Sequence, residues 1–210
     1  MNTKVFAITA IAAIATAAQA DIAYNTQERY IKKTASLFTG SYSQTLTNNT
    51  FDDWDAELTG GFSDIEGGVD AYATQTSSFG ANSIVASGTA GGSVGPPAGS
   101  SAGYGVSHLL VSFSLAQASD YTLDFSMLGE FGYYSLTGGS LNFSGDTWSQ
   151  IDHNLSGTLA AGEYEFLIDL GTGGSFGNGS FDLNFQIVPT PASVSLLGLG
   201  FLTVTRRRRV

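Results

Sequence analysis

Apolar and polar residues alternate in Phe181-Asp182-Leu183-Asn184-Phe185-Gln186-Ile187, the stretch that most clearly decides how this chain folds. A repeat of two is the period of a β-strand with one buried face. The pattern recurs in Tyr121–Met127, in His108–Ala116, and in Tyr164–Leu170 with Leu167 as the exception. Weaker candidates for strands are Tyr42–Leu46, Val69–Ser77, Ser83–Ser87, Ser140–Ser144 and Trp148–Leu159.

About nine such strands predict an all-β fold of two antiparallel sheets packed face to face. A jelly-roll or lectin-like β-sandwich is the preferred arrangement, and a closed barrel is the alternative. One short helix is expected near the N-terminus, over Thr26–Phe38, because Glu28 stands four residues before Lys32 beside an apolar stripe. The glycine-rich segment Ala86–Gly105 is expected to be a long surface loop.

Composition excludes several classes of protein. The 210 residues carry a net charge of −10, which argues against binding nucleic acid through its phosphates. The chain has no cysteine, so disulfides, thiolate metal sites and cysteine nucleophiles are absent. Residues 21–188 hold three basic residues against all eighteen acidic ones, a net charge of −15. Stability must therefore come from apolar burial and backbone hydrogen bonds rather than from ion pairs.

The first twenty residues have the three parts of a secretory signal peptide. Lys4 is followed by an almost unbroken apolar run, and Ala18 and Ala20 fit the rule for cleavage before Asp21. The alternative, a permanent membrane anchor, requires an apolar run of about 20 residues, and this run is shorter. Export through the Sec machinery is therefore expected.

The last residues combine two prolines, an uncharged segment and a basic end. Pro189 and Pro191 precede residues 192–205, which are expected to form a hydrophobic helix, and Arg206, Arg207, Arg208 and Arg209 follow. Fourteen helical residues reach about 21 Å, less than the roughly 30 Å of the bilayer core. The segment is thus predicted to be a weak, transient anchor in the inner membrane, with the arginines on the cytoplasmic side.

This tail, Pro189-Thr190-Pro191-Ala192 with the apolar segment and the arginine block, resembles the sorting signal of PEP-CTERM proteins. Thr190 stands where that family usually has Glu. The resemblance covers the last 23 residues or so. It implies that a membrane-embedded exosortase removes the tail and releases the protein at the surface of a Gram-negative bacterium that makes exopolysaccharide and biofilm matrix. A plain C-terminal anchor without processing is the alternative.

Seven carboxylates gather within nineteen residues, between glycines that allow tight turns. Oxygen ligands in such a segment suit Ca²⁺, although the spacing is not that of an EF-hand, and a solvated acidic surface is the alternative. The candidate ligands are Asp52, Asp53, Asp55, Glu57, Asp64, Glu66 and Asp70.

Aromatic residues offer a candidate platform for sugar rings. Neighbours on a strand face opposite sides, so one of Tyr133 and Tyr134 is expected to be exposed, and Trp148 is the third candidate. Packing in the core is the alternative for each of them. An extracellular polysaccharide is the partner that such a platform would bind.

No catalytic residue is predicted. Two Gly-x-Ser-x-Gly matches, at 91–95 and 173–177, lack the following helix of a nucleophile elbow. His108 and His153 have no metal-binding spacing, and Asp124, Glu165, Asp169 and Asp182 lie on the polar faces of strands. The leading hypothesis is a non-enzymatic structural or adhesive matrix protein at the cell surface. The alternatives are a calcium-dependent carbohydrate-binding module and, third, an extracellular hydrolase with a carboxylate pair.

Overall fold

The computed structural model describes residues 21–64, 67–95, 101–139, 141–147, 149–173 and 177–188. Within the chain, Ala20–Pro189 forms one compact unit. Several predictions lie outside the described residues: the signal residues Ala18 and Ala20, the sorting residues 189–192 and 206–209, the helix over 192–205, Glu66 and Trp148. The side chain of Asp64 is likewise not described.

The described part of the chain consists of thirteen β-strands and contains no helix. The strands are β1 (Ile22–Leu37), β2 (Gly40–Asn48), β3 (Trp54–Leu58), β4 (Gly61–Asp64), β5 (Gly67–Gly80), β6 (Ser83–Val94), β7 (Ala102–Leu115), β8 (Ser119–Leu128), β9 (Phe131–Gly138), β10 (Leu141–Thr147), β11 (Ile151–Leu159), β12 (Gly162–Thr172) and β13 (Gly177–Val188). Accordingly, these residues include no helix of the length and apolarity needed to cross a membrane.

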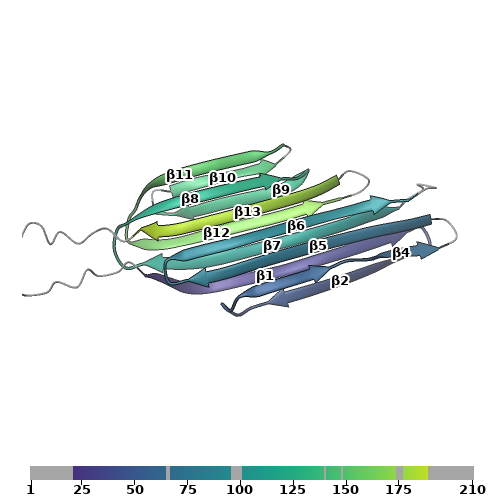
Figure 1. The fold of residues 1–210 in the computed structure, drawn as a ribbon, viewed down its shortest axis with the longest axis horizontal. Coiled ribbons are helices and arrows are strands. Elements are labelled where there is room, and N and C mark those ends of the chain that lie inside the picture. Colours follow the sequence, from purple (N-terminus) through teal and green to yellow (C-terminus); the bar gives the residue numbers. More distant parts are fainter. Residues whose placement is uncertain are drawn as a thin grey trace, which may run out of the picture. The chain divides into compact units, whose positions relative to one another are not determined.

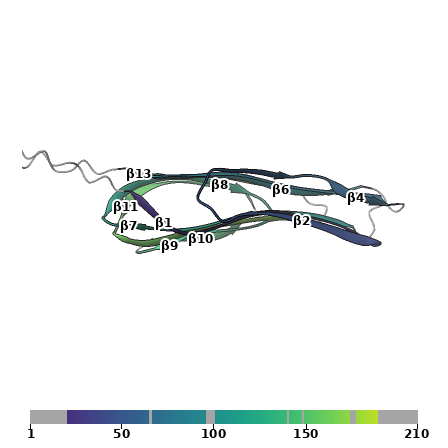
Figure 2. The same cartoon turned by 90° about the horizontal axis from the view of Figure 1, so that it is seen from below.

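The strands form two sheets in which all neighbours are antiparallel (Figure 1). Sheet A has the order β10-β9-β12-β7-β1-β2, and sheet B has the order β11-β8-β13-β6-β5-β3, with β4 also paired to β5. The two sheets lie as separate layers when viewed edge-on (Figure 2). The expected antiparallel β-sandwich is therefore what forms.

Apolar side chains on the facing sides of the two sheets make up the core. Phe113 of β7 lies 5.5 Å from Phe185 of β13, centroid to centroid, and Phe166 of β12 lies 5.1 Å from Phe185. These rings join the two layers, and each fully buried side chain of this size contributes about 2 kcal/mol. The core holds the sheets at a fixed spacing and so fixes which residues share an outer face.

The four strongest strand predictions are confirmed. Phe181, Leu183, Phe185 and Ile187 are all buried, and the polar residues between them face outward. Residues 121–127, 164–170 and 108–116 follow the same rule within β8, β12 and β7. Leu167, the exception in the pattern, lies on the outer face of β12.

The predicted helix over Thr26–Phe38 is wrong, because residues 22–37 form β1. Alternate residues of this strand do face the interior, but two of them are charged. Arg29 is 0% exposed and Lys33 is 6% exposed, and both lie in the same buried series as Ile31. Because these two buried positions are charged, the sequence does not show the alternation of apolar and polar residues that would have predicted a strand here.

The predicted loop over Ala86–Gly105 is also wrong, since most of it belongs to β6 and β7. Its glycines lie where the sheets approach most closely: a Cβ on Gly92 would stand 2.2 Å from the carbonyl oxygen of Gly103. A Cβ on Gly105 would stand 2.1 Å from the carbonyl oxygen of Tyr72. Here glycine serves close packing of two sheets rather than a flexible connection.

Candidate functional site

A row of five side chains crosses the outer face of sheet A. The strand register places them side by side: Asp146 on β10, Tyr133 on β9, Asp169 on β12, His108 on β7 and Tyr30 on β1. Their neighbours along each strand point into the core, so alternation leaves these five on the solvent side. Residues separated by more than a hundred positions in sequence thus meet on one surface.

An open hollow of about 550 Å³ occupies this part of the sheet. Tyr30 and Tyr133 line it together with Phe131 and with the carboxylates of Glu130, Asp146 and Asp169. Phe131 is 53% exposed and Tyr133 is 41% exposed, so both rings offer a face or an edge to solvent. The hollow therefore combines exposed aromatic surface with three acidic side chains.

Tyr30 is held in place by His108. The two rings are stacked, with 4.5 Å between centroids and 13° between planes, and His108 Nδ1 lies 3.6 Å from Asp169 Oδ1. Burial raises the pKa of Tyr30, and the negative charges of Asp169 and Glu28 add to the rise. The phenol of Tyr30 therefore stays protonated well above neutral pH and keeps its capacity to donate a hydrogen bond.

The chemistry of this surface allows contact with a sugar ring. Aromatic rings bury the apolar C–H face of a ring-shaped ligand, and ionised carboxylates accept hydrogen bonds from several hydroxyl groups. The hollow is open rather than enclosed, which fits one stretch of a long polymer better than a small molecule that must be surrounded.

The structure separates the predicted sugar-binding residues. Tyr133 lies in the hollow, whereas Tyr134 points into the core and is 6% exposed. The ring of Tyr134 packs 4.9 Å from Phe125, and its hydroxyl lies 3.2 Å from His153 Nε2. Trp148 lies outside the described residues. One exposed tyrosine of the pair is what the alternation predicted.

Five side chains of the hollow are not among the candidates that the sequence offers: Tyr30, Glu130, Phe131, Asp146 and Asp169. Tyr30 lies within Thr26–Phe38, for which the sequence predicts a helix, and Asp169 lies on a strand face that the sequence predicts to be solvated. Asp146 stood alone without a recognisable motif. The alternation in β9 and β12 gives the side on which Tyr133 and Asp169 lie, but only the register between strands shows that they are neighbours.

The described acids of the 52–70 segment are spread along the edge of sheet B. Asp55 and Glu57 lie opposite Thr76 and Thr74 of β5, and Asp70 lies four residues further along β5, about 13 Å away at ~3.3 Å per residue. The backbone carbonyl oxygen of Asp52 accepts a hydrogen bond from Arg29 Nη2 at 2.9 Å, and the Asp52 carboxylate accepts one from Thr50 Oγ1 at 3.0 Å. Among the described residues, no three His, Asp or Glu side chains lie close enough together to hold a metal ion.

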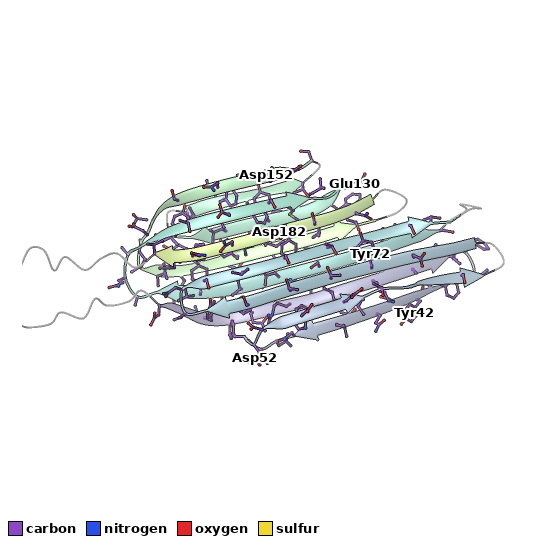
Figure 3. All side chains as sticks on the ribbon, in the orientation of Figure 1. Tyr42, Asp52, Tyr72, Glu130, Asp152 and Asp182 are labelled. Carbon is purple, nitrogen blue, oxygen red and sulfur yellow. The ribbon has the colours of Figure 1, made fainter. Side chains whose placement is uncertain are left out.

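A second open hollow, of about 410 Å³, lies on the outer face of sheet B. Asp152 and Asp182, labelled in Figure 3, line it together with Asp124 and Asn154. Asn154 Nδ2 donates a hydrogen bond to Asp124 Oδ1 at 2.6 Å. Its two aromatic lining residues, Phe125 and His153, belong to the inward series of their strands. It therefore presents carboxylates and amides without an exposed ring, so the hollow on sheet A is the better candidate.

The remaining motifs do not form a catalytic arrangement in the part described. Ser93, in the first Gly-x-Ser-x-Gly match, lies within β6 opposite Asp70 rather than on the sharp strand-to-helix turn of a nucleophile elbow. The serine of the second match lies outside the described residues. His108 stacks on Tyr30, and His153 lies 4.5 Å from Phe143 between ring centroids.

Comparison with known proteins finds no family model that matches the chain and no curated protein that matches it.

Proposed function

We propose that this protein is exported, sorted to the cell surface and retained there as a non-enzymatic structural or adhesive component of an extracellular polysaccharide matrix. The observation that carries the proposal is the hollow on sheet A, where Tyr30, Phe131 and Tyr133 stand beside three carboxylates. The jelly-roll or lectin-like arrangement of the sandwich is part of this proposal. The export route rests on the signal residues before Asp21 and on the PEP-CTERM-like tail.

Binding of a polysaccharide is tested with a glycan array and the exported protein. Replacing Tyr133 with Ala removes an aromatic contact worth about 1.4 kcal/mol, so affinity is expected to fall roughly tenfold. Tyr42→Ala is the matched control, because Tyr42 is 46% exposed and lies on edge strand β2 outside the hollow. Equal loss of binding in both variants, or no binding by the unaltered protein, contradicts the proposal.

The sorting part of the proposal has a separate test. Mass spectrometry of the protein recovered from the cell surface is expected to find a C-terminus near residue 190. A surface protein that retains Arg206–Arg209 contradicts processing by an exosortase and leaves a plain anchor as the explanation.

The calcium-dependent binding module remains the second candidate, because Asp55 and Glu57 share the outer side of β3 and the segment continues to Asp64 and Glu66. Repeating the array with EDTA distinguishes the two forms of binding. Titration with CaCl₂ that gives neither heat nor a rise in melting temperature eliminates the calcium site.

A hydrolase is the third candidate, since Asp146 and Asp169 flank Tyr133 on either side. Strands two apart are separated by about 9.6 Å, close to the spacing of an inverting glycosidase. Such an enzyme needs one carboxylic acid in an apolar environment, whereas the side chain of Asp169 is 48% exposed. We expect no release of reducing sugar from any glycan that binds; release that is lost in Asp146→Asn supports the hydrolase instead.

A further inference from the structure

Strand β2 leaves one edge of sheet A open to pairing. Its nine residues include no charged residue and no proline, and it pairs with β1 in an unbroken register. Natural proteins protect such edges with lysines, prolines, bulges or a covering segment, because an exposed edge offers free backbone donors and acceptors. β2 has none of the first three, although the body of the protein carries a net charge of −15.

The strand directions make the two edges of each sheet complementary. Five antiparallel steps lead from β10 to β2 in sheet A, and five lead from β11 to β3 in sheet B. The two edge strands of each sheet therefore run in opposite directions. A second copy placed beside the first by translation alone sets its β10 antiparallel to β2 and its β11 antiparallel to β3.

The edge strands of the two sheets lie on the same two sides of the sandwich. At one side β10 covers β11, since the Phe143 and His153 rings are 4.5 Å apart. At the other side Arg29 of β1 lies 5.6 Å from the Trp54 ring of β3. One translation can thus bring both pairs of edges together.

The two sheets are also staggered by the same amount. Following the register across sheet A, Gly145–Thr147 of β10 lie level with Asn48–Leu46 of β2, an overlap of three rows. Across sheet B, Ile151–His153 of β11 lie level with Ala56–Trp54 of β3, again three rows. A single displacement of the second copy along the strands therefore lengthens both contacts at once.

A displacement of four residues, about 13 Å, aligns the edges. It places residues 142–147 of the second copy opposite Thr47–Tyr42, with outer faces on the same side because the shift is even. In sheet B it moves Asp152 of the second copy away from Asp55, and it brings Asn154 and Ser156 opposite Glu57 and Asp55. Amide and hydroxyl donors then face carboxylates in place of a like charge.

We propose that copies of this chain join edge to edge into an open ribbon, with β2 and β3 of one copy paired to β10 and β11 of the next. The contact is heterologous and the operation is a translation, so it does not close on itself. The backbone ladder across each junction is that of strand addition to an exposed edge. Because each copy is strongly acidic, assembly requires salt to screen the repulsion between copies. The screening length is about 10 Å at an ionic strength of 0.1 M.

Disulfide trapping tests the register, because the chain has no cysteine of its own. Thr45 and Ser144 are exposed residues on opposite edges of sheet A that the proposed displacement places face to face. Exported protein carrying Thr45→Cys and Ser144→Cys is oxidised in 0.5 M NaCl and examined on a non-reducing gel. We expect a ladder of dimers, trimers and longer multimers.

Matched variants give the result its meaning. Thr45→Cys with Thr76→Cys, which puts the second thiol on the exposed face of internal strand β5, is expected to give no ladder. Equal ladders in both double variants overturn the proposal, as does a monomeric band in Thr45→Cys with Ser144→Cys. Dimers from Thr45→Cys alone indicate a symmetric β2–β2 contact and overturn it too.

Discussion

Arg29 shows how one buried cation organises its surroundings. Its guanidinium donates from Nη1 to Ser77 Oγ at 2.7 Å and from Nε to Gln27 Oε1 at 3.0 Å, and Nη2 donates to the carbonyl oxygens of Thr50 and Asp52. Burial lowers the pKa of Arg29, and the negative charges of Asp52 and Asp53 oppose that effect. The residue thereby fixes the connection between β2 and β3 to the interior.

Replacing Arg29 with Met is expected to lower the free energy of unfolding by about 3 kcal/mol, because several buried acceptors lose their donor. Lys32→Met on the same strand removes the same charge from an exposed position and should change stability by no more than about 0.5 kcal/mol. Urea denaturation of both variants measures the difference. Similar losses in the two variants would show that charge, not the buried hydrogen bonds, matters.

Tyr24 predicts how stability depends on alkaline pH. Its hydroxyl lies 2.8 Å from the carbonyl oxygen of Gly80 and 2.7 Å from that of Ser83, and its single hydrogen is shared between these two acceptors. Burial raises the pKa of Tyr24 above the value near 10 that tyrosine has in an unfolded chain. Below pH 10 the Tyr24 phenol is neutral in both the folded and the unfolded chain, so the folded state keeps its full stability. As pH rises beyond 10 the phenol ionises more readily in the unfolded chain, and the free energy of unfolding falls.

We expect the free energy of unfolding to fall between pH 10 and pH 12, and to fall less steeply in Tyr24→Phe. Chemical denaturation at a series of pH values measures the slope, and absorbance at 295 nm follows ionisation of the phenols. Tyr42→Phe, at an exposed position, is the control and should keep the slope of the unaltered protein. Identical slopes in all three proteins would contradict this role of Tyr24.

At the scale of the strand, glycine decides how closely β5 and β7 pack across the two sheets. A Cβ at Gly103 would lie 2.3 Å from the carbonyl oxygen of Asp70, a distance that side chains do not tolerate. A Cβ at Gly68 would meet only the Ser63 Cβ at 3.7 Å, an ordinary contact. The backbones of the two sheets meet at Gly103, whereas the near neighbour of Gly68 is its partner on the adjacent strand of sheet B.

Gly103→Ala is accordingly expected to destabilise the protein by about 2 kcal/mol or more, because backbone atoms must move apart. Gly68→Ala should be neutral or slightly stabilising, since alanine restricts the unfolded chain. Thermal unfolding followed by circular dichroism compares the two. A neutral Gly103→Ala would mean that the layers are not in backbone contact there.

At the scale of the whole molecule, charge is almost unpaired. Within the residues described, the one contact between a basic and an acidic side chain at ion-pair distance is His108 Nδ1 with Asp169 Oδ1, and it carries opposite charges only when His108 is protonated. Residues 21–188 carry a net charge of −15. Repulsion between carboxylates therefore destabilises the folded state, and salt screens it.

The melting temperature is expected to rise between 10 mM and 200 mM NaCl, a range in which screening dominates over other effects of salt. Differential scanning calorimetry measures the change. Asp55→Asn with Glu57→Gln removes two exposed charges and should raise the melting temperature most at the low-salt end. A melting temperature that falls with salt would indicate stabilising ion pairs that outweigh the repulsion.

Sequence alone was sufficient where the physics is local. In a strand with one solvent-exposed face, apolar and polar residues alternate along the sequence. The alternation in residues 181–187 therefore predicted both the strand and its buried side. The same rule predicted that only one of Tyr133 and Tyr134 would be exposed. It failed over residues 26–38 because Arg29 and Lys33 occupy buried positions, where their partners come from distant segments.

Composition and alternation determined that this chain forms an acidic, two-layered β structure without cysteine chemistry. Tertiary structure alone decided that Asp146, Tyr133, Asp169, His108 and Tyr30 stand in one row, and that the glycines of 86–105 lie between packed sheets. The physical reason is that a side chain's face depends on its own strand, whereas its neighbours depend on register between strands far apart in sequence.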